Sequence, residues 1–170
     1  MNLSYKFIEA QSGALFVPSI SLSSASVEPL KIQDLPLTEC CVDIHRSIGE
    51  VAGLFERHPD WPGVILTARD QFVGLLTRRE CSEFLGNLPG AGLFAEVSIF
   101  VFFEKHTTCS LFLGGSTSVH EAARAALSRE GASVDDPLVV RLGEHHYGLL
   151  DVQVLLRAHN APLKNHTGGD

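Results

Sequence analysis

An internal repeat is the feature that most constrains how this chain folds. One copy contains Ser47-Ile48-Gly49-Glu50 and the other contains Ser118-Val119-His120-Glu121. In both, a serine is followed three residues later by a glutamate, which is the pattern of a helix capping box. Apolar residues at helical spacing follow each box. The sequence therefore predicts two amphipathic helices at equivalent positions of a duplicated unit.

Two apolar hairpins extend the repeat downstream of these helices. Their expected strands are 63–66 with 72–76, and 138–140 with 147–150. Each hairpin runs directly into another stretch of helical periodicity. The predicted unit is therefore strand, helix, strand, strand, helix, present twice. The caps lie 71 residues apart and the hairpin glycines 74 apart, so a three-residue insertion is expected in the second copy, near 129–136.

One copy of such a unit cannot cover both faces of its own sheet, whereas two copies packed together can. We therefore predict an α/β fold of the α+β type. Two β-α-β-β-α motifs pack as a pseudo-twofold pair, and each has a small three-stranded sheet with two helices. The motifs are expected at 35–88 and 110–158, joined by a connecting segment, 89–109. A loosely docked arm is expected at 1–34 and a disordered tail at 159–170.

Composition and charge exclude several classes of protein. Hydrophobic residues make up 45% of the 170 residues, enough to build a core. A net charge of -7 disfavours a nucleic-acid partner. The longest apolar tract, 93–103, is too short to cross a membrane. The N-terminus lacks a signal-peptide pattern, so a cytoplasmic protein is expected.

No residue pattern indicates catalysis or a metal site. The cysteines lack C-x-x-C spacing and are interpreted as free thiols: Cys40, Cys41, Cys81 and Cys109. His145 and His146 are interpreted as solvated turn residues, because no further ligand lies at metal-binding spacing. A hydrolase or transferase with a histidine base is the weakest hypothesis, since nothing places a nucleophile beside a histidine. We expect a protein that is not an enzyme.

The first hairpin-to-helix junction reads Gly74-Leu75-Leu76-Thr77-Arg78-Arg79-Glu80. With the duplicated order of elements, it resembles the cystathionine-β-synthase (CBS) domain family, whose tandem pair is called a Bateman module. That family closes each motif with Gly, two hydrophobic residues, Thr or Ser, two variable residues and Asp. Here Glu80 replaces the Asp. In the second junction Asp151 replaces the hydroxyl residue and Val154 the carboxylate. The resemblance spans roughly 35–158.

The resemblance implies a cleft between the motifs that binds an adenosine-containing ligand, AMP, ADP, ATP or S-adenosylmethionine, with no cofactor required. The Thr would contact phosphate and the acid would contact ribose. The expected ligand-binding residues are Gly74, Thr77, Arg78, Glu80 and Asp151. Independently, a helix N-terminus at Thr77 with two arginines beside it favours anions. A purely structural role stays open, because T-x-x-E is itself a capping box and Asp is a good N-cap.

The sequence thus favours a regulatory, ligand-sensing pair of motifs that signals through the packing of a homodimer to an output domain, fused or separate. The alternative is a ligand-free scaffold for interaction or oligomerisation, which the divergent second junction supports. A dense aromatic tract is predicted to form a subunit interface in preference to lining a ligand pocket. Its members are Phe94, Phe100, Phe102 and Phe103.

Overall fold

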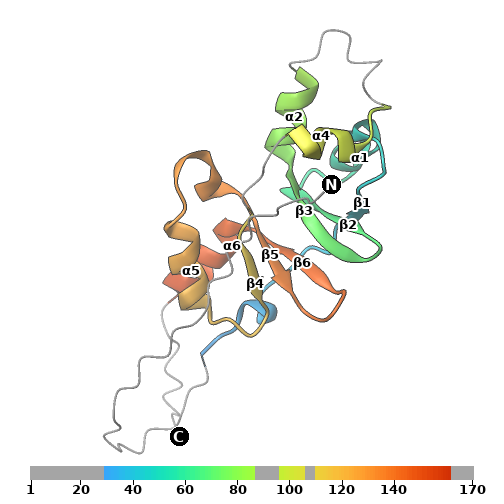
Figure 1. Cartoon of the computed structure of the whole chain (residues 1–170). Helices are drawn as coiled ribbons and strands as arrows, with labels where there is room; N and C mark the ends of the chain where they lie inside the picture. Colours follow the sequence, from blue (N-terminus) through green and yellow to red (C-terminus); the bar gives the residue numbers. More distant parts are fainter. Residues whose placement is uncertain (1–28, 87–95, 106–109, 162–170) are drawn as a thin grey trace, which may run out of the picture.

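Two three-stranded sheets with the same topology form the centre of the molecule (Figure 1). The structure is a computed structural model that describes residues 29–86, 96–105 and 110–161. In each sheet the first strand runs parallel to the second, and the second runs antiparallel to the third. The strands are β1 Cys41–Asp43, β2 Gly63–Ala68, β3 Gln71–Thr77, β4 Phe112–Gly114, β5 Leu138–Arg141 and β6 Tyr147–Leu150. The predicted fold class and its duplicated order are confirmed.

Each sheet is followed by helices at the predicted places. These are α1 Ile48–Arg57, α2 Arg78–Gly86, α5 Val119–Leu127 and α6 Val152–Asn160. Both predicted capping boxes are present. The Ser47 hydroxyl accepts from Glu50 N at 3.2 Å, and the Glu50 carboxylate accepts from Ser47 N at 2.9 Å. The Ser118 box has the corresponding bonds at 3.2 and 3.3 Å.

The connections between the elements differ between the copies. Arg69 and Asp70 join β2 to β3 with φ of 51° and 62°. Two successive positive φ angles are the signature of the tight turn that matches the twist of a hairpin. The insertion predicted near 129–136 contains a short 3₁₀ helix, η2 Gly131–Asp135, which lies between α5 and β5.

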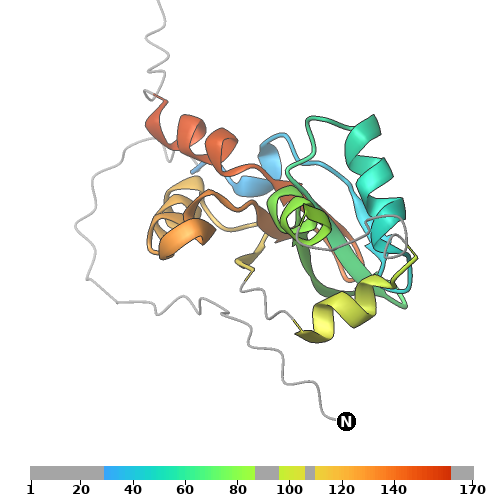
Figure 2. The same ribbon diagram turned by 90° about the horizontal axis from the view of Figure 1, so that it is seen from above.

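The two sheets face each other between the helices. Val139, Tyr147 and Leu149 of the second sheet belong to the core of the first motif. The rings of Phe72, Phe112 and Tyr147 extend this contact, with centroids 4.9 to 6.2 Å apart. From above, α1 and α5 lie on opposite sides of the molecule (Figure 2). The motifs therefore share buried surface, as the burial argument predicts.

The segment that leads into each motif packs on the other motif. Ile32, in the 3₁₀ helix η1 Ile32–Asp34, is 0% exposed and belongs to the second core. Ile99, which begins α4 Ile99–Lys105, is 0% exposed and belongs to the first core. We call residues 30–34 and 97–105 the lead-in segments. Each lead-in segment therefore packs on the motif that it does not precede, as expected for two motifs related by an approximate twofold axis.

Backbone hydrogen bonds attach both lead-in segments in the same way. Ile32 N donates to Thr117 O at 3.0 Å, and Ile99 N donates to Arg46 O at 2.8 Å. Both acceptors directly precede a cap serine. The first helical N–H of α5 and of α1 donates back to residues 30 and 97, at 2.8 and 2.9 Å. Each lead-in segment thus satisfies an N–H group that the start of the helix leaves unpaired.

The structure corrects the expected bounds of the N-terminal arm and of the C-terminal tail. Residues 30–34 were expected in a loosely docked arm, yet Ile32 is fully buried. The connecting segment contains helix α4, and residues 159–160 of the expected tail end helix α6. In the aromatic tract, Phe100 and Phe103 are partly buried against the first core, and a role of the tract in a subunit interface stays a prediction.

Other parts of these expectations lie outside what is described. Residues 1–28, 87–95, 106–109 and 162–170 are not described, and neither is the Phe102 side chain. Over the described ranges, every helix is too short or too polar to span a bilayer.

Candidate functional site

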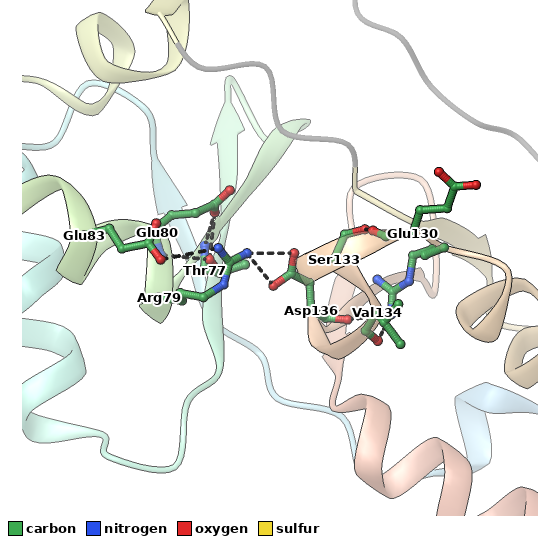
Figure 3. A network of polar contacts seen from close by, with 9 residues as sticks. Thr77, Arg79, Glu80, Glu83, Glu130, Ser133, Val134 and Asp136 are labelled. Carbon is green, nitrogen blue, oxygen red and sulfur yellow. Dashed lines mark hydrogen bonds and ion pairs between the residues drawn. The ribbon is translucent and has the colours of Figure 1, made fainter.

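The first hairpin-to-helix junction is a closed hydrogen-bonded unit. Thr77, at the end of β3, is 3% exposed. Its N–H and hydroxyl donate to Glu80 Oε2 at 2.9 and 2.8 Å, and its oxygen accepts from Glu80 N at 3.1 Å. The predicted T-x-x-E capping box is therefore present and begins α2 (Figure 3). Ligand contact by Thr77 and Glu80 stays a prediction.

The Arg78 side chain binds backbone carbonyl oxygens of the first motif. Its Nε donates to Trp61 O at 3.0 Å and its Nη1 to Phe55 O at 3.1 Å, while Nη2 bonds to His58 O. Its guanidinium also lies 4.8 Å from the centre of the Phe55 ring. A cation that binds carbonyls at the end of α1 complements the helix dipole. In this structure Arg78 therefore stabilises the end of α1.

Arg79, the next residue, reaches across to the second motif. Its Nη2 lies 3.1 and 3.3 Å from the two carboxylate oxygens of Asp136, and its Nη1 lies 3.5 Å from Glu83 Oε1 (Figure 3). The side chain of Asp136 is 18% exposed and that of Arg79 is 43% exposed. The hydrogen bond to Asp136 raises the pKa of Arg79 further above its ordinary value. This ion pair joins the two motifs beside the N-terminus of α2.

Arg129 holds the inserted turn of the second motif. It donates to Ala126 O at 3.2 Å, Val134 O at 3.0 Å and Asp136 O at 2.8 Å. Burial lowers the pKa of its guanidinium from the ordinary value. Among the described residues, its buried Nη1 has no hydrogen-bond partner. An unpaired buried donor of this kind costs about 1–3 kcal/mol, which an acceptor from a ligand would offset.

Arg79 and Arg129 therefore approach Asp136 from two sides, one at its carboxylate and the other at its carbonyl oxygen. We call these three residues and the Thr77–Glu80 cap the seam. The predicted site did not include Arg79, Arg129 or Asp136. The signals that could have indicated them are the second arginine after Thr77 and the acidic end of the predicted insertion.

The hairpin glycines are sites of close packing. A Cβ added at Gly74 would lie 2.1 Å from Cζ of Phe103, and one at Gly148 would lie 3.0 Å from Cβ of Leu37. No side chain fits at Gly74 unless Phe103 moves. Contact between Gly74 and a ligand stays a prediction.

The second junction lacks the paired hydroxyl and carboxylate. The Asp151 carboxylate accepts from Gln153 N at 2.6 Å and caps α6, as the structural interpretation predicts. Val154 packs against the second core. The structure therefore places the chemistry of the expected site at the first junction only, and a ligand role for Asp151 stays a prediction.

Cys40, Cys41 and the turn histidines are not part of the seam, whereas Cys81 directly follows Glu80 in α2. Cys40 is buried and its neighbour Cys41 is exposed, and Cys81 is buried. Burial raises the pKa of Cys40 to about 12 and that of Cys81 to about 11. His146 Nε2 lies 3.0 Å from Glu39 Oε1. In the described ranges, no three His, Cys, Asp or Glu side chains converge as metal ligands would.

Comparison with solved structures identifies the fold. A CBS-domain-containing protein of unknown function from Kribbella flavida matches with a TM-score of 0.60 and 14% identity, over 78% of this chain and 99% of that one. CBSX2 in complex with AMP matches with a TM-score of 0.55 and 17% identity, over 76% and 96%. The CBS domain of a bacterial CNNM/CorC-family Mg²⁺ transporter in complex with ATP matches with 0.58 and 10%, over 76% and 86%. No protein-family model and no curated protein matches the chain.

Proposed function

We propose that this chain, which has the fold of a tandem CBS-domain pair, is a non-catalytic regulatory module that binds an adenosine-type nucleotide between its motifs. AMP, ADP, ATP and S-adenosylmethionine are the candidate ligands. The AMP complex of CBSX2 and the ATP complex of the transporter domain support this ligand class. The observation that carries the proposal is the seam, where two guanidinium groups meet at Asp136 beside a helix N-terminus.

The two guanidinium groups at the seam are the groups that would bind an anion. The whole chain has a net charge of -7, yet Arg79 and Arg129 come together here. Within the seam the carboxylates of Asp136 and Glu80 balance these two charges, and Glu83 also lies 3.5 Å from Arg79, so an incoming anion would have to displace a carboxylate from Arg79. A phosphate offers more negative charge and more acceptor oxygens, and guanidinium groups bind phosphate in a bidentate manner. The N-terminus of α2 adds a favourable dipole.

Binding would proceed by exchange at Arg79. The ligand phosphate takes the place of the Asp136 carboxylate on the Arg79 guanidinium, and the Nη1 of Arg129 gains an acceptor. Glu80 would then leave Thr77 and accept from the ribose hydroxyls. Because Asp136 lies directly after η2, its release would let the inserted turn shift against α2. That shift would change how the motifs pack and, in a homodimer, would be passed to an output domain.

The test is a calorimetric titration with AMP, ADP, ATP and S-adenosylmethionine, together with thermal unfolding. A ligand at about 100 times its dissociation constant should add about 2.7 kcal/mol of stability. Asp136→Asn removes the competing charge and should tighten binding several-fold. Arg79→Ala should weaken it at least about tenfold, the typical loss for one charge-assisted hydrogen bond.

Arg46→Ala is the matched control. It removes another exposed arginine–carboxylate pair, with Glu50 at 3.1 Å, away from the seam. Binding by this variant should equal that of the parent chain. If Asp136→Asn weakens binding, or if Arg79→Ala and Arg46→Ala bind alike, the exchange at Arg79 is wrong.

The second candidate function is a ligand-free scaffold for interaction or oligomerisation. The observation that favours it is that the expected ligand-binding residues already have partners within the chain. Thr77, Glu80 and Arg78 are hydrogen-bonded, and Phe103 packs on Gly74. A scaffold would show no stabilisation by any of the four nucleotides and would still self-associate. The titration therefore separates the two candidates.

A further inference from the structure

Two histidines from different helices of the second motif face each other at the surface. His120 lies in the first turn of α5 and His159 in the last turn of α6. Their ring centroids are 5.1 Å apart, with 42° between the planes. The two rings border a surface groove of about 380 Å³ whose other lining residues are Arg124, Leu127 and Ser128. The groove belongs to the second motif, whereas the seam lies where α2 meets the inserted turn.

The spacing of the rings fits two imidazoles on one zinc ion. A Zn–N bond is about 2.05 Å and a ring nitrogen lies about 1.2 Å from the ring centre, so two imidazoles at a tetrahedral angle have centres about 5.3 Å apart. The observed separation is 5.1 Å. We propose that His120 and His159 together form half of a zinc site.

The pair is incomplete within one chain. Zinc in structural sites takes four ligands, and over the described ranges no third histidine, cysteine or carboxylate joins the pair. A twofold axis through the groove would bring the same surface of a second copy against it, because such an interface uses the same patch on both subunits. The second copy would then supply the other two imidazoles. The site is a four-histidine zinc bridge between two copies of this chain.

The rest of the groove is suited to such an interface. Leu127 is 56% exposed, an apolar side chain that the second copy would cover. Arg124, with its positive charge, lines the same groove.

The experiment uses the full chain, dialysed against EDTA and titrated with zinc chloride. Bound zinc is measured by elemental analysis and molecular mass by sedimentation. The proposal expects about 0.5 zinc per chain in a species of twice the chain mass. His120→Ala and His159→Ala should each lose this zinc, and His145→Ala, which changes a turn histidine away from the groove, should keep it. Unfolding midpoints without zinc verify that each variant folds.

One zinc per chain on a monomer would overturn the bridge, as would unchanged zinc binding in His120→Ala or His159→Ala. Nucleotide titration of His159→Ala in EDTA keeps this outcome separate from the proposed function. The zinc site and nucleotide binding use different residues, so either can fail while the other holds.

Discussion

Replacing Ile32 or Ile99 with alanine tests whether the two motifs depend on each other for their cores. Both side chains are 0% exposed. Ile32 precedes the first motif but lies in the core of the second, and Ile99 precedes the second motif but lies in the core of the first. Loss of a buried isoleucine to alanine costs about 2–5 kcal/mol through lost burial and the remaining cavity. With a urea m-value of about 2 kcal/mol/M, a loss of about 3 kcal/mol lowers the midpoint by about 1.5 M.

Trp61 makes this measurement specific. It is the only tryptophan of the chain and packs against the first core. Ile32→Ala damages the second core, yet it should lower the midpoint reported by Trp61 fluorescence if the motifs unfold as one unit. Circular dichroism should give the same midpoint.

Leu30→Ala and Val101→Ala are matched controls from the same two lead-in segments. Leu30 is 50% exposed and Val101 is 43% exposed, so each change should cost within about 0.5 kcal/mol. The reasoning is refuted if Ile32→Ala is no more destabilising than Leu30→Ala. It is also refuted if Trp61 reports the parent midpoint while circular dichroism shows an earlier transition.

Three further predictions follow from local contacts. Ser118→Ala should cost about 1 kcal/mol in urea unfolding at pH 7. The folded-state pKa of Glu121 is lowered, so its contribution is present above its unfolded pKa of about 4.3 and is lost as pH falls through the folded pKa. A cost that does not decrease at any pH during acid titration would contradict this. Native labelling with iodoacetamide at pH 8, followed by peptide mass spectrometry, should modify exposed Cys41 before the buried Cys40 and Cys81. Burial raises the pKa of all three thiols, to about 12 for Cys40 and about 11 for Cys81, and early labelling of Cys81 would contradict the burial. Gly74→Ala should lower the thermal midpoint more than Gly53→Ala, because only the added methyl at 74 meets a ring; equal midpoints would mean that Phe103 moves freely.

The features predictable from the sequence were local ones. Both serine caps and both hairpins follow from short-range patterns, because their residue types act within three or four positions of each other. The lead-in segments were not predictable in this way. Ile32 is one apolar residue in a short irregular stretch, and nothing within that stretch indicates that it packs on a motif that begins about 80 residues later.

At the candidate site, too, the sequence predicted the types of residue present but not which of them contact the other motif. The sequence of the first junction predicted positive charge after Thr77 but did not indicate which arginine faces the second motif. Successive residues of a helix point about 100° apart, so Arg78 contacts the end of α1 while Arg79 contacts Asp136. The position of the insertion was predicted from the offset of the repeats. That its acidic end would bind Arg79 depends on how the motifs pack.

The most direct test of nucleotide binding at the seam is the change in backbone amide NMR shifts when AMP or ATP is added. The two junctions serve as an internal comparison, because the first has the hydroxyl–carboxylate pair and the second has Asp151 and Val154. We predict large shifts at Thr77, Glu80 and Asp136, with much smaller ones at Gly148 and Val154. Equal shifts at both junctions, or none at the first with either nucleotide at millimolar concentration, would contradict the account.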